Sequence, residues 1–233
     1  MAPVGGKPRI ILTDDHTLIS EGVARLLEPE FEIVGRFSDG RTLLEHAEQL
    51  EPDVVIMDLA MPYLNGIDAG QRLKALLPNT KIVVLTVCED AEVAATVMRQ
   101  WASGYLLKKS ASAELLTTVR EVLHGRSYVT THLTQDLIQN FIRNPVPAEK
   151  KQLTARQREV LQLLAEGGTL KEVAKVLGLA TRTVAYHKYR LMEEHGLRTN
   201  SDLVLLALAE KVISAPSNLS SKTALSSKDP VRR

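Results

Sequence analysis

Two different patterns of apolar and polar residues divide the chain. In the first half, five short runs rich in β-branched residues indicate buried strands, and between them apolar positions recur every three to four residues, as in amphipathic helices. Strands that alternate with helices in this way predict an α/β fold with a doubly wound sheet of five parallel strands. The predicted strands span residues 9–13, 31–37, 53–58, 81–85 and 104–107, and the predicted helices span residues 16–28, 40–50, 66–77, 90–101 and 112–124.

The second half, from residue 153, shows no strand pattern and indicates a small all-α unit of short helices separated by glycines. Two segments match the capping box, in which a Thr and a Gln or Glu three residues later bond reciprocally to backbone amides at a helix start. A short helix, a tight glycine turn and a helix with basic and aromatic outer residues form a helix-turn-helix pattern. The boxes pair Thr154 with Gln157 and Thr169 with Glu172, the turn contains Gly178, and the third and fourth helices are predicted over residues 181–194 and 202–213.

Composition sets the boundaries between these units. The stretch 144–151 contains two prolines and three charged residues, which is typical of an exposed hinge. The last residues are rich in Ser and Lys and contain too few apolar side chains to form a packed structure. We therefore predict an α/β domain at 7–125, a linker at 126–152 with a helix near 132–143, a helix-turn-helix domain at 153–213 and a disordered tail at 214–233.

The net charge of +1 conceals an asymmetry between the two halves. Residues 1–125 carry 12 Lys and Arg against 18 Asp and Glu, whereas the residues from 151 onward carry 14 against 8. The basic half is suited to a polyanion such as DNA. No apolar run approaches the roughly 18 residues of a membrane span, and the N-terminus lacks the apolar core of a signal peptide. We therefore expect a cytoplasmic protein with no membrane partner.

Polar residues stand at the carboxyl ends of four predicted strands. Asp14 and Asp15 follow the first strand, Asp58 ends the third, Thr86 follows the fourth and Lys108 follows the fifth. Each of them alone has an ordinary structural explanation, but the carboxyl ends of parallel strands meet at the edge where ligands bind, so together they predict a site. Aspartate oxygens suit Mg²⁺, and a carboxylate can accept a phosphoryl group whose charge the Lys and Thr side chains help to neutralise.

With these residues in this order, residues 7–125 resemble the receiver domain of response regulators, which has a flavodoxin-like sheet. The resemblance implies that the site accepts a phosphoryl group in the presence of Mg²⁺ and then changes conformation. It implies Asp58 as phosphoacceptor, Asp14, Asp15, Asp58 and the backbone carbonyl of Ala60 as Mg²⁺ ligands, Thr86 and Lys108 as phosphoryl contacts, and Tyr105 as the aromatic side chain that changes rotamer on activation.

Two residues depart from the receiver pattern. Val87 stands where the family usually has Ala or Gly, and Lys109 stands where it often has a cis-proline. If the Val87 side chain faces the site, its two γ-methyl groups should hinder the water that hydrolyses an acyl phosphate. A long-lived phosphoryl group is then expected.

Residues 153–213 resemble the LuxR-type helix-turn-helix domain, so the chain as a whole resembles a NarL/FixJ-type response regulator. The pattern is visible in Leu153-Thr154-Ala155-Arg156, Lys171-Glu172-Val173-Ala174 and Thr183-Val184-Ala185-Tyr186-His187. By resemblance, the third helix enters the major groove of double-stranded DNA and the fourth forms a dimer contact. The DNA-binding residues implied are Ala185, Tyr186 and Tyr189 toward bases, Lys188 and Arg190 toward phosphates, and Thr181 and Arg182 at the helix start; the dimerisation residues are Val204, Leu205 and Leu208.

These features predict a phosphorylation-controlled transcription regulator. A sensor histidine kinase or a small phosphodonor would phosphorylate Asp58, with the protein catalysing its own modification, and a receiver that masks the third or fourth helix would then release it to bind DNA as a homodimer. One alternative is an Asp-nucleophile phosphatase, which needs a second acid two positions after the nucleophile, whereas Asp14 and Asp15 are adjacent. The other is a regulator that binds DNA or protein without phosphorylation.

Overall fold

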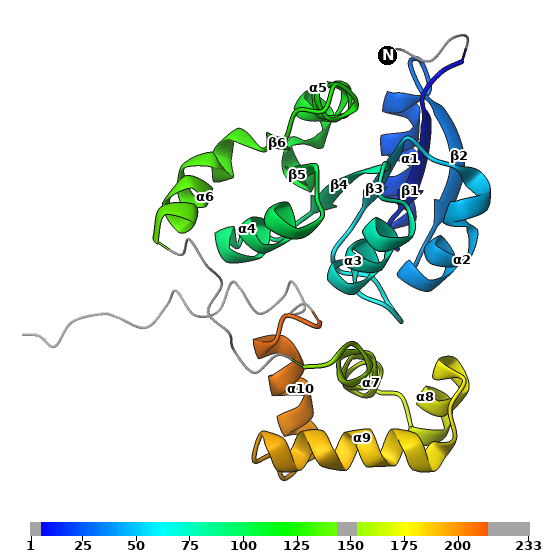
Figure 1. Ribbon diagram of the computed structural model, residues 1–233, viewed down its shortest axis with the longest axis vertical. Coiled ribbons are helices and arrows are strands. Elements are labelled where there is room, and N and C mark those ends of the chain that lie inside the picture. Colours follow the sequence, from blue (N-terminus) through cyan, green and yellow to red (C-terminus); the bar gives the residue numbers. More distant parts are fainter. Residues whose placement is uncertain (1–5, 144–152, 214–233) are drawn as a thin grey trace, which may run out of the picture.

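The computed structural model describes residues 6–143 and 153–213. Its first domain is built on a parallel sheet of six strands in the order β2-β1-β3-β4-β5-β6 (Figure 1). The inner strands β3 and β5 are buried along their whole length, as expected of apolar runs covered on both faces. The strands are β1 (Arg9–Thr13), β2 (Glu32–Phe37), β3 (Val54–Met57), β4 (Lys81–Thr86), β5 (Gly104–Leu107) and β6 (Tyr128–Val129).

Helices cover both faces of this sheet. α1 and α5 pack on one face, where Leu27 and Val119 join a buried cluster with strand residues. α2, α3 and α4 pack on the other face around Leu43, Leu73 and Val97. The helices are α1 (Thr17–Leu27), α2 (Gly40–Leu50), α3 (Gly66–Leu76), α4 (Ala91–Gln100) and α5 (Ala111–Leu123), with the 3₁₀ turn η1 (Lys108–Ser110) before α5. The doubly wound α/β architecture is therefore confirmed.

The strand count of five is wrong, because β6 adds a sixth parallel strand beside β5. Gly125, at a φ of 79°, turns the chain after α5, and Tyr128 and Val129 then pair with Gly104 and Tyr105. Two residues are too few to show a period of two, so β6 could not be recognised from its pattern. The predicted linker therefore begins as part of the sheet.

The helix expected in the linker is present as α6 (Thr131–Arg143) and packs on α4. Leu133 and Leu137 join the buried cluster on that face of the sheet, and the Arg99 guanidinium lies 4.4 Å from the centre of the Phe141 ring. The remainder of the predicted linker, residues 144–152, and the predicted tail, 214–233, lie outside the described residues.

The second domain consists of four helices around two small buried clusters. Both predicted capping boxes are present, and a third pairs Thr199 with Asp202. The last helix is shorter than expected, because it ends at Ala209 and Lys211 takes a left-handed conformation with a φ of 55°. The helices are α7 (Ala155–Ala165), α8 (Leu170–Leu177), α9 (Thr181–Glu194) and α10 (Asn200–Ala209). Among the helices described, none has the length and apolar character needed to cross a membrane.

Candidate functional site

The predicted polar residues meet at the carboxyl edge of the sheet, where the strand order reverses. β1 pairs with β2 on one side and with β3 on the other, so the loops after β1 and β3 leave the sheet in opposite directions and open a crevice between them. Asp14 and Asp15 follow β1, and Asp58 follows β3. Asp58 is 2% exposed and Asp14 is 8% exposed, so both carboxylates sit in a protected position.

Lys108 joins the two buried acids. Its Nζ lies 2.7 Å from Asp14 Oδ2 and 2.7 Å from Asp58 Oδ2. Burial would lower the pKa of Lys108, but the hydrogen bonds and charges of Asp14 and Asp58 outweigh it, so the net pKa shift is upward and the ammonium stays charged. An ammonium group held between two carboxylates can also neutralise the oxygens of an incoming phosphoryl group.

Backbone amides hold the other oxygen of Asp58. Its Oδ1 accepts hydrogen bonds from the amides of Leu59, at 2.6 Å, and Ala60, at 3.3 Å. The following turn approaches this backbone closely: a Cβ on Gly66 would stand 2.1 Å from the Asp58 carbonyl oxygen. Only a residue without a side chain fits at the start of α3, which fixes the loop that carries the predicted phosphoacceptor.

The acids also form a cluster that could hold a metal ion. One ligand atom each from Asp14, Asp15, His16 and Asp58 lies within 4.8 Å of the others. Three carboxylates suit a hard cation such as Mg²⁺, and Asp14 Oδ2 is a buried oxygen that has no hydrogen bond apart from its ion-pair contact with Lys108. The donor set therefore fits the predicted metal.

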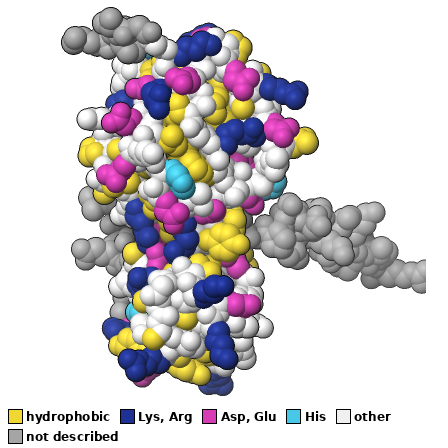
Figure 2. Space-filling model, turned by 90° about the vertical axis from the view of Figure 1, so that its right-hand side faces the viewer, with side chains coloured by type: hydrophobic (Ala, Val, Ile, Leu, Met, Phe, Trp, Pro, Cys, Tyr) yellow, Lys and Arg dark blue, Asp and Glu magenta, His cyan; other side chains and the backbone are white. Residues whose placement is uncertain are grey.

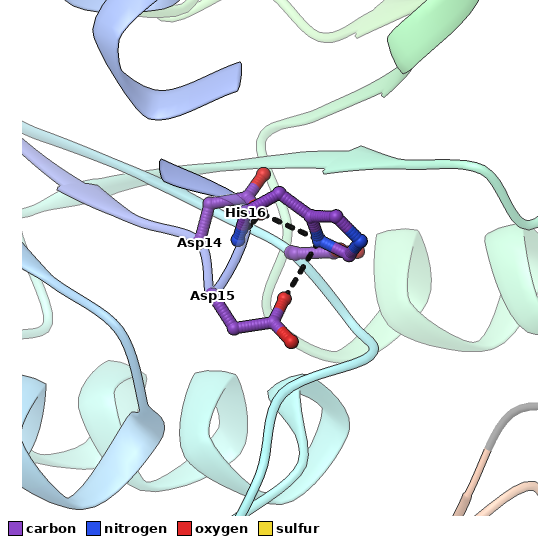
Figure 3. A group of neighbouring side chains, drawn as sticks. Asp14, Asp15 and His16 are labelled. Atoms are coloured by element: carbon purple, nitrogen blue, oxygen red, sulfur yellow. Dashed lines mark hydrogen bonds and ion pairs between the residues drawn. The ribbon is translucent and has the colours of Figure 1, made fainter. Parts of the chain in front are cut away.

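His16 is a member of this cluster that the sequence prediction missed. Its Nδ1 lies 2.8 Å from Asp15 Oδ1 and 3.2 Å from Asp14 Oδ1, so the imidazole bridges the acid pair (Figure 3). The sequence signal was its position directly after two acids at a strand end. The bend that turns its ring back toward them is visible only in the structure.

Thr86 and Tyr105 lie on the neighbouring strands and face the loop after β4. The Thr86 hydroxyl accepts a hydrogen bond from the Cys88 amide, and the Tyr105 hydroxyl donates one to the Cys88 carbonyl at 2.8 Å. Tyr105 is fully buried, and burial followed by the nearby Cys88 raises the pKa of its hydroxyl. Both side chains therefore hold one loop, which can couple them to each other.

Val87, the residue after Thr86, is exposed. Its side chain is 68% exposed, so it contacts little of the protein in this conformation. The slow hydrolysis expected of a Val87 side chain that faces the site therefore stays a prediction.

The residues predicted to bind DNA gather on the outer side of α9. Thr181, Arg182, Tyr186, Tyr189 and Arg190 are exposed, and Ala185 and Lys188 are partly exposed. Val184 and Leu191, on the inner side, are fully buried. Two contacts order the outer face: Arg190 Nη1 donates to the Tyr186 hydroxyl at 3.1 Å, and Lys188 Nζ donates to Asn200 Oδ1 at 2.8 Å.

The helical domain has a basic face that suits a polyanion and an apolar strip that suits a second protein surface. Figure 2 shows Lys and Arg side chains predominating on the visible face of this lower part of the molecule, whereas acids and bases are mixed over the sheet domain above. On α10, Leu205 is 64% exposed, and Val204 and Leu208 are partly exposed. An exposed Leu beside two half-buried apolar residues leaves an apolar strip on the surface.

Of the two helices that the receiver was expected to mask, the third or the fourth, the third is not covered by the sheet domain. Figure 1 shows α9 on the side of the helical domain that faces away from the sheet domain, while α7 lies between them. The contacts agree: Arg158 Nε lies 2.9 Å from Asp68 Oδ1, and Arg72 Nη2 lies 2.6 Å from Glu159 Oε1, which joins α7 to α3. Near the fourth helix, Lys211, which follows the end of α10, forms an ion pair with Asp90 of the sheet domain.

Comparisons with known families match both domains. Residues 10–120 match the family described as response regulator receiver domain, and residues 151–207 match the bacterial regulatory proteins of the luxR family. The acid cluster and α9 each fall inside the corresponding match.

Individual relatives have the same two-domain organisation. The chain is 33% identical over 214 residues to oxygen regulatory protein NreC of Staphylococcus aureus, covering 88% of this chain and 99% of the relative. A structure of RcsB in complex with DNA superposes with a TM-score of 0.56 at 26% identity, covering 88% and 99%. RcsB of Salmonella typhimurium superposes with a TM-score of 0.60 at 25% identity, again covering 88% and 99%. The chain therefore belongs to the NarL/FixJ-type response regulators, in which a receiver domain precedes a LuxR-type helix-turn-helix domain.

Proposed function

We propose that this protein is a DNA-binding transcription regulator controlled by phosphorylation of Asp58 by a sensor histidine kinase. The observation that carries the proposal is the pair of 2.7 Å contacts from Lys108 to Asp14 and Asp58, in the crevice of a chain that also carries the exposed face of α9. A buried carboxylate, a fixed ammonium and an acid cluster supply the parts that phosphoryl transfer needs, namely positioning and charge neutralisation.

The transfer uses side chains that the structure already brings to the site. An Asp58 oxygen forms a bond to phosphorus while the phosphorus–nitrogen bond of the kinase phosphohistidine breaks and the leaving imidazole takes up a proton. Lys108 then pairs with a phosphoryl oxygen, and the Thr86 hydroxyl can turn from the Cys88 amide to donate to another. In a separate step, hydrolysis, a water attacks phosphorus, loses its proton and displaces Asp58, which returns the carboxylate and inorganic phosphate. The chemistry is limited to the protein's own side chain, so the protein is a regulator and not an enzyme with a separate substrate.

Mg²⁺ is the cofactor that fits this site. Asp14, Asp15, Asp58 and the backbone carbonyl of Ala60 would hold it, together with waters. When bound, it supplies positive charge to the transferring phosphoryl oxygens.

The output is binding of double-stranded DNA as a homodimer. The face of α9 that carries Tyr186 and Tyr189 would enter the major groove, and the strip formed by Val204, Leu205 and Leu208 would join two copies. A related structure contains two RcsB dimers bound to two parallel DNAs, which supports the dimer for this chain. Because bacterial DNA lies in the cytoplasm, we place its action there.

Phosphorylation should increase DNA binding by the full chain. Genomic DNA fragments would be footprinted with the purified protein in Mg²⁺, with and without a small phosphodonor such as acetyl phosphate. We expect protected sites that appear, or gain at least tenfold in affinity, only with the donor. Equal protection in both samples would favour the alternative regulator that works without phosphorylation, and multiple turnover on a phosphomonoester would favour the phosphatase.

Lys188 and Tyr186 should affect DNA binding in different ways. Lys188→Ala should weaken binding to DNA of every sequence to a similar degree, because one phosphate contact is lost. It should also reduce the slope of log affinity against log salt concentration by about 1. Tyr186→Ala should compress the ratio of specific to non-specific affinity by about 1–3 kcal/mol, because a base contact is lost. Titrations of a footprinted site and a random duplex at several salt concentrations measure both. If only Lys188→Ala changed the sequence preference, Lys188 would be the residue that contacts a base and Tyr186 would not.

A further inference from the structure

The helical domain holds the backbone of the loop that follows the phosphoacceptor. Gln162 projects from α7 into the β3–α3 loop and is 1% exposed. Its Nε2 donates to the Met61 carbonyl at 2.9 Å, and its Oε1 accepts from the Asn65 amide at 2.9 Å and from Asn65 Nδ2 at 3.2 Å. One side chain therefore binds the loop at both ends of the stretch 61–65.

Neighbouring side chains extend this contact in two directions. Glu166, the C-cap residue of α7, accepts from Gln162 Nε2 at 2.7 Å and from the backbone amide of Tyr63. Asn65 Nδ2 also donates to Asp68 Oδ2 at 2.8 Å, and Asp68 pairs with Arg158 of α7. Buried polar groups of this kind are costly to leave without partners, so the loop conformation and the docked position of α7 depend on each other.

The loop held in this way is the one that forms the phosphorylation site. Asp58 begins it, and the Ala60 carbonyl precedes Met61 directly. The helical domain makes a second contact at the end of the loop after β4. There, Lys211 Nζ lies 2.6 Å from Oδ2 of Asp90, the N-cap of α4. The helical domain is thus docked on the same edge of the sheet where phosphorylation occurs, and not on a remote face.

We propose that Gln162 is a positioning residue for Asp58, through which the docked DNA-binding domain restrains the β3–α3 loop and slows phosphorylation. The inference rests on the proposed function for the role of Asp58. Since the coupling free energy between two sites is reciprocal, a docked contact that makes the phosphorylated state less stable is itself weakened by phosphorylation to the same degree. Because α9 is exposed in the docked arrangement, this coupling acts on the docking of α7 and not on the exposure of α9.

The test measures amide exchange and phosphorylation in the full chain. In Gln162→Ala, we expect hydrogen–deuterium exchange at the Asn65 amide to rise at least tenfold, because its acceptor is lost. The adjacent Gly66 amide bonds to the Leu59 carbonyl at 2.8 Å within the loop and serves as an internal reference. The initial rate of phosphorylation by acetyl phosphate in Mg²⁺ should rise at least threefold in the same variant. Phosphorylation of the unaltered chain should also raise exchange at Asn65.

Arg72→Ala is the matched control. It removes an ion pair between the domains, but Glu159 keeps its partner Arg156 at 2.7 Å and no bond to the loop is lost. We expect both readouts to stay within twofold of the unaltered chain. Equal changes in the two variants would show that docking in general, and not Gln162, sets the rate, and would overturn the proposal. Unchanged exchange at Asn65 or an unchanged rate in Gln162→Ala would also overturn it. If neither the unaltered chain nor any variant gained a phosphoryl group, the proposed function itself would be overturned.

Discussion

Asp58→Ala should abolish phosphorylation of this protein. In Mg²⁺ and acetyl phosphate, the unaltered chain is expected to gain one phosphoryl group that is stable in acid and labile in base, as an acyl phosphate is. The variant should gain none, because it lacks the carboxylate that pairs with Lys108 at 2.7 Å and whose backbone is fixed by α3 through Gly66. Intact-mass measurement before and after a brief base treatment distinguishes the phosphorylated chain from the unphosphorylated one.

Two further variants make this result specific. Asp53→Ala removes an acid at the opposite end of β3, where its carboxylate accepts from the Arg9 amide, and should leave labelling intact. Asp15→Asn keeps the phosphoacceptor but removes one ligand charge, so it should weaken Mg²⁺ affinity and shift labelling to higher Mg²⁺ concentration. Undiminished labelling of Asp58→Ala would place the phosphoacceptor elsewhere. Unchanged Mg²⁺ affinity in Asp15→Asn would remove that residue from the metal site.

The site could be anticipated from the sequence because its residues follow strands with strong local signals. A run such as Val54–Met57 is buried on both faces in any parallel sheet, so the polar residue after it must lie at the edge. Asp14, Asp58 and Lys108 each follow such a run, and parallel pairing alone brings them together. The capping boxes at Thr154 and Thr169 are local in the same sense, since each is complete within four residues.

Other features depend on contacts between distant residues and left no local signal. Gln162 is a buried polar residue on α7, and its partners Met61 and Asn65 are about a hundred residues away. The exposed position of Val87 depends on the path of the loop after β4. The burial of Gln162 and the exposure of Val87 both run against hydrophobicity, which is why an apolar pattern could not predict them.

The second large effect is expected at Gly66, the first residue of α3. A Cβ there would stand 2.1 Å from the Asp58 carbonyl oxygen and 2.6 Å from the Leu59 Cα, and both are backbone atoms that cannot rotate away. Gly66→Ala should therefore destabilise the receiver domain by about 3 kcal/mol, at the upper end of the usual overpacking cost. It should also displace the phosphoacceptor and slow its labelling. Urea unfolding followed by the fluorescence of Trp101, the single tryptophan, measures the stability of this domain.

Gly22→Ala is the control for this substitution, because it makes the same chemical change within α1 where nothing lies within 4 Å of the added Cβ. There the gain in helix propensity should stabilise the domain by about 0.5–1 kcal/mol. Opposite signs for the two variants would show that close contact with the Asp58 backbone, and not the loss of a glycine, decides the outcome. Similar unfolding midpoints for Gly66→Ala and the unaltered chain would mean that the loop can move away from α3, and the rigid placement of Asp58 would then have to be abandoned.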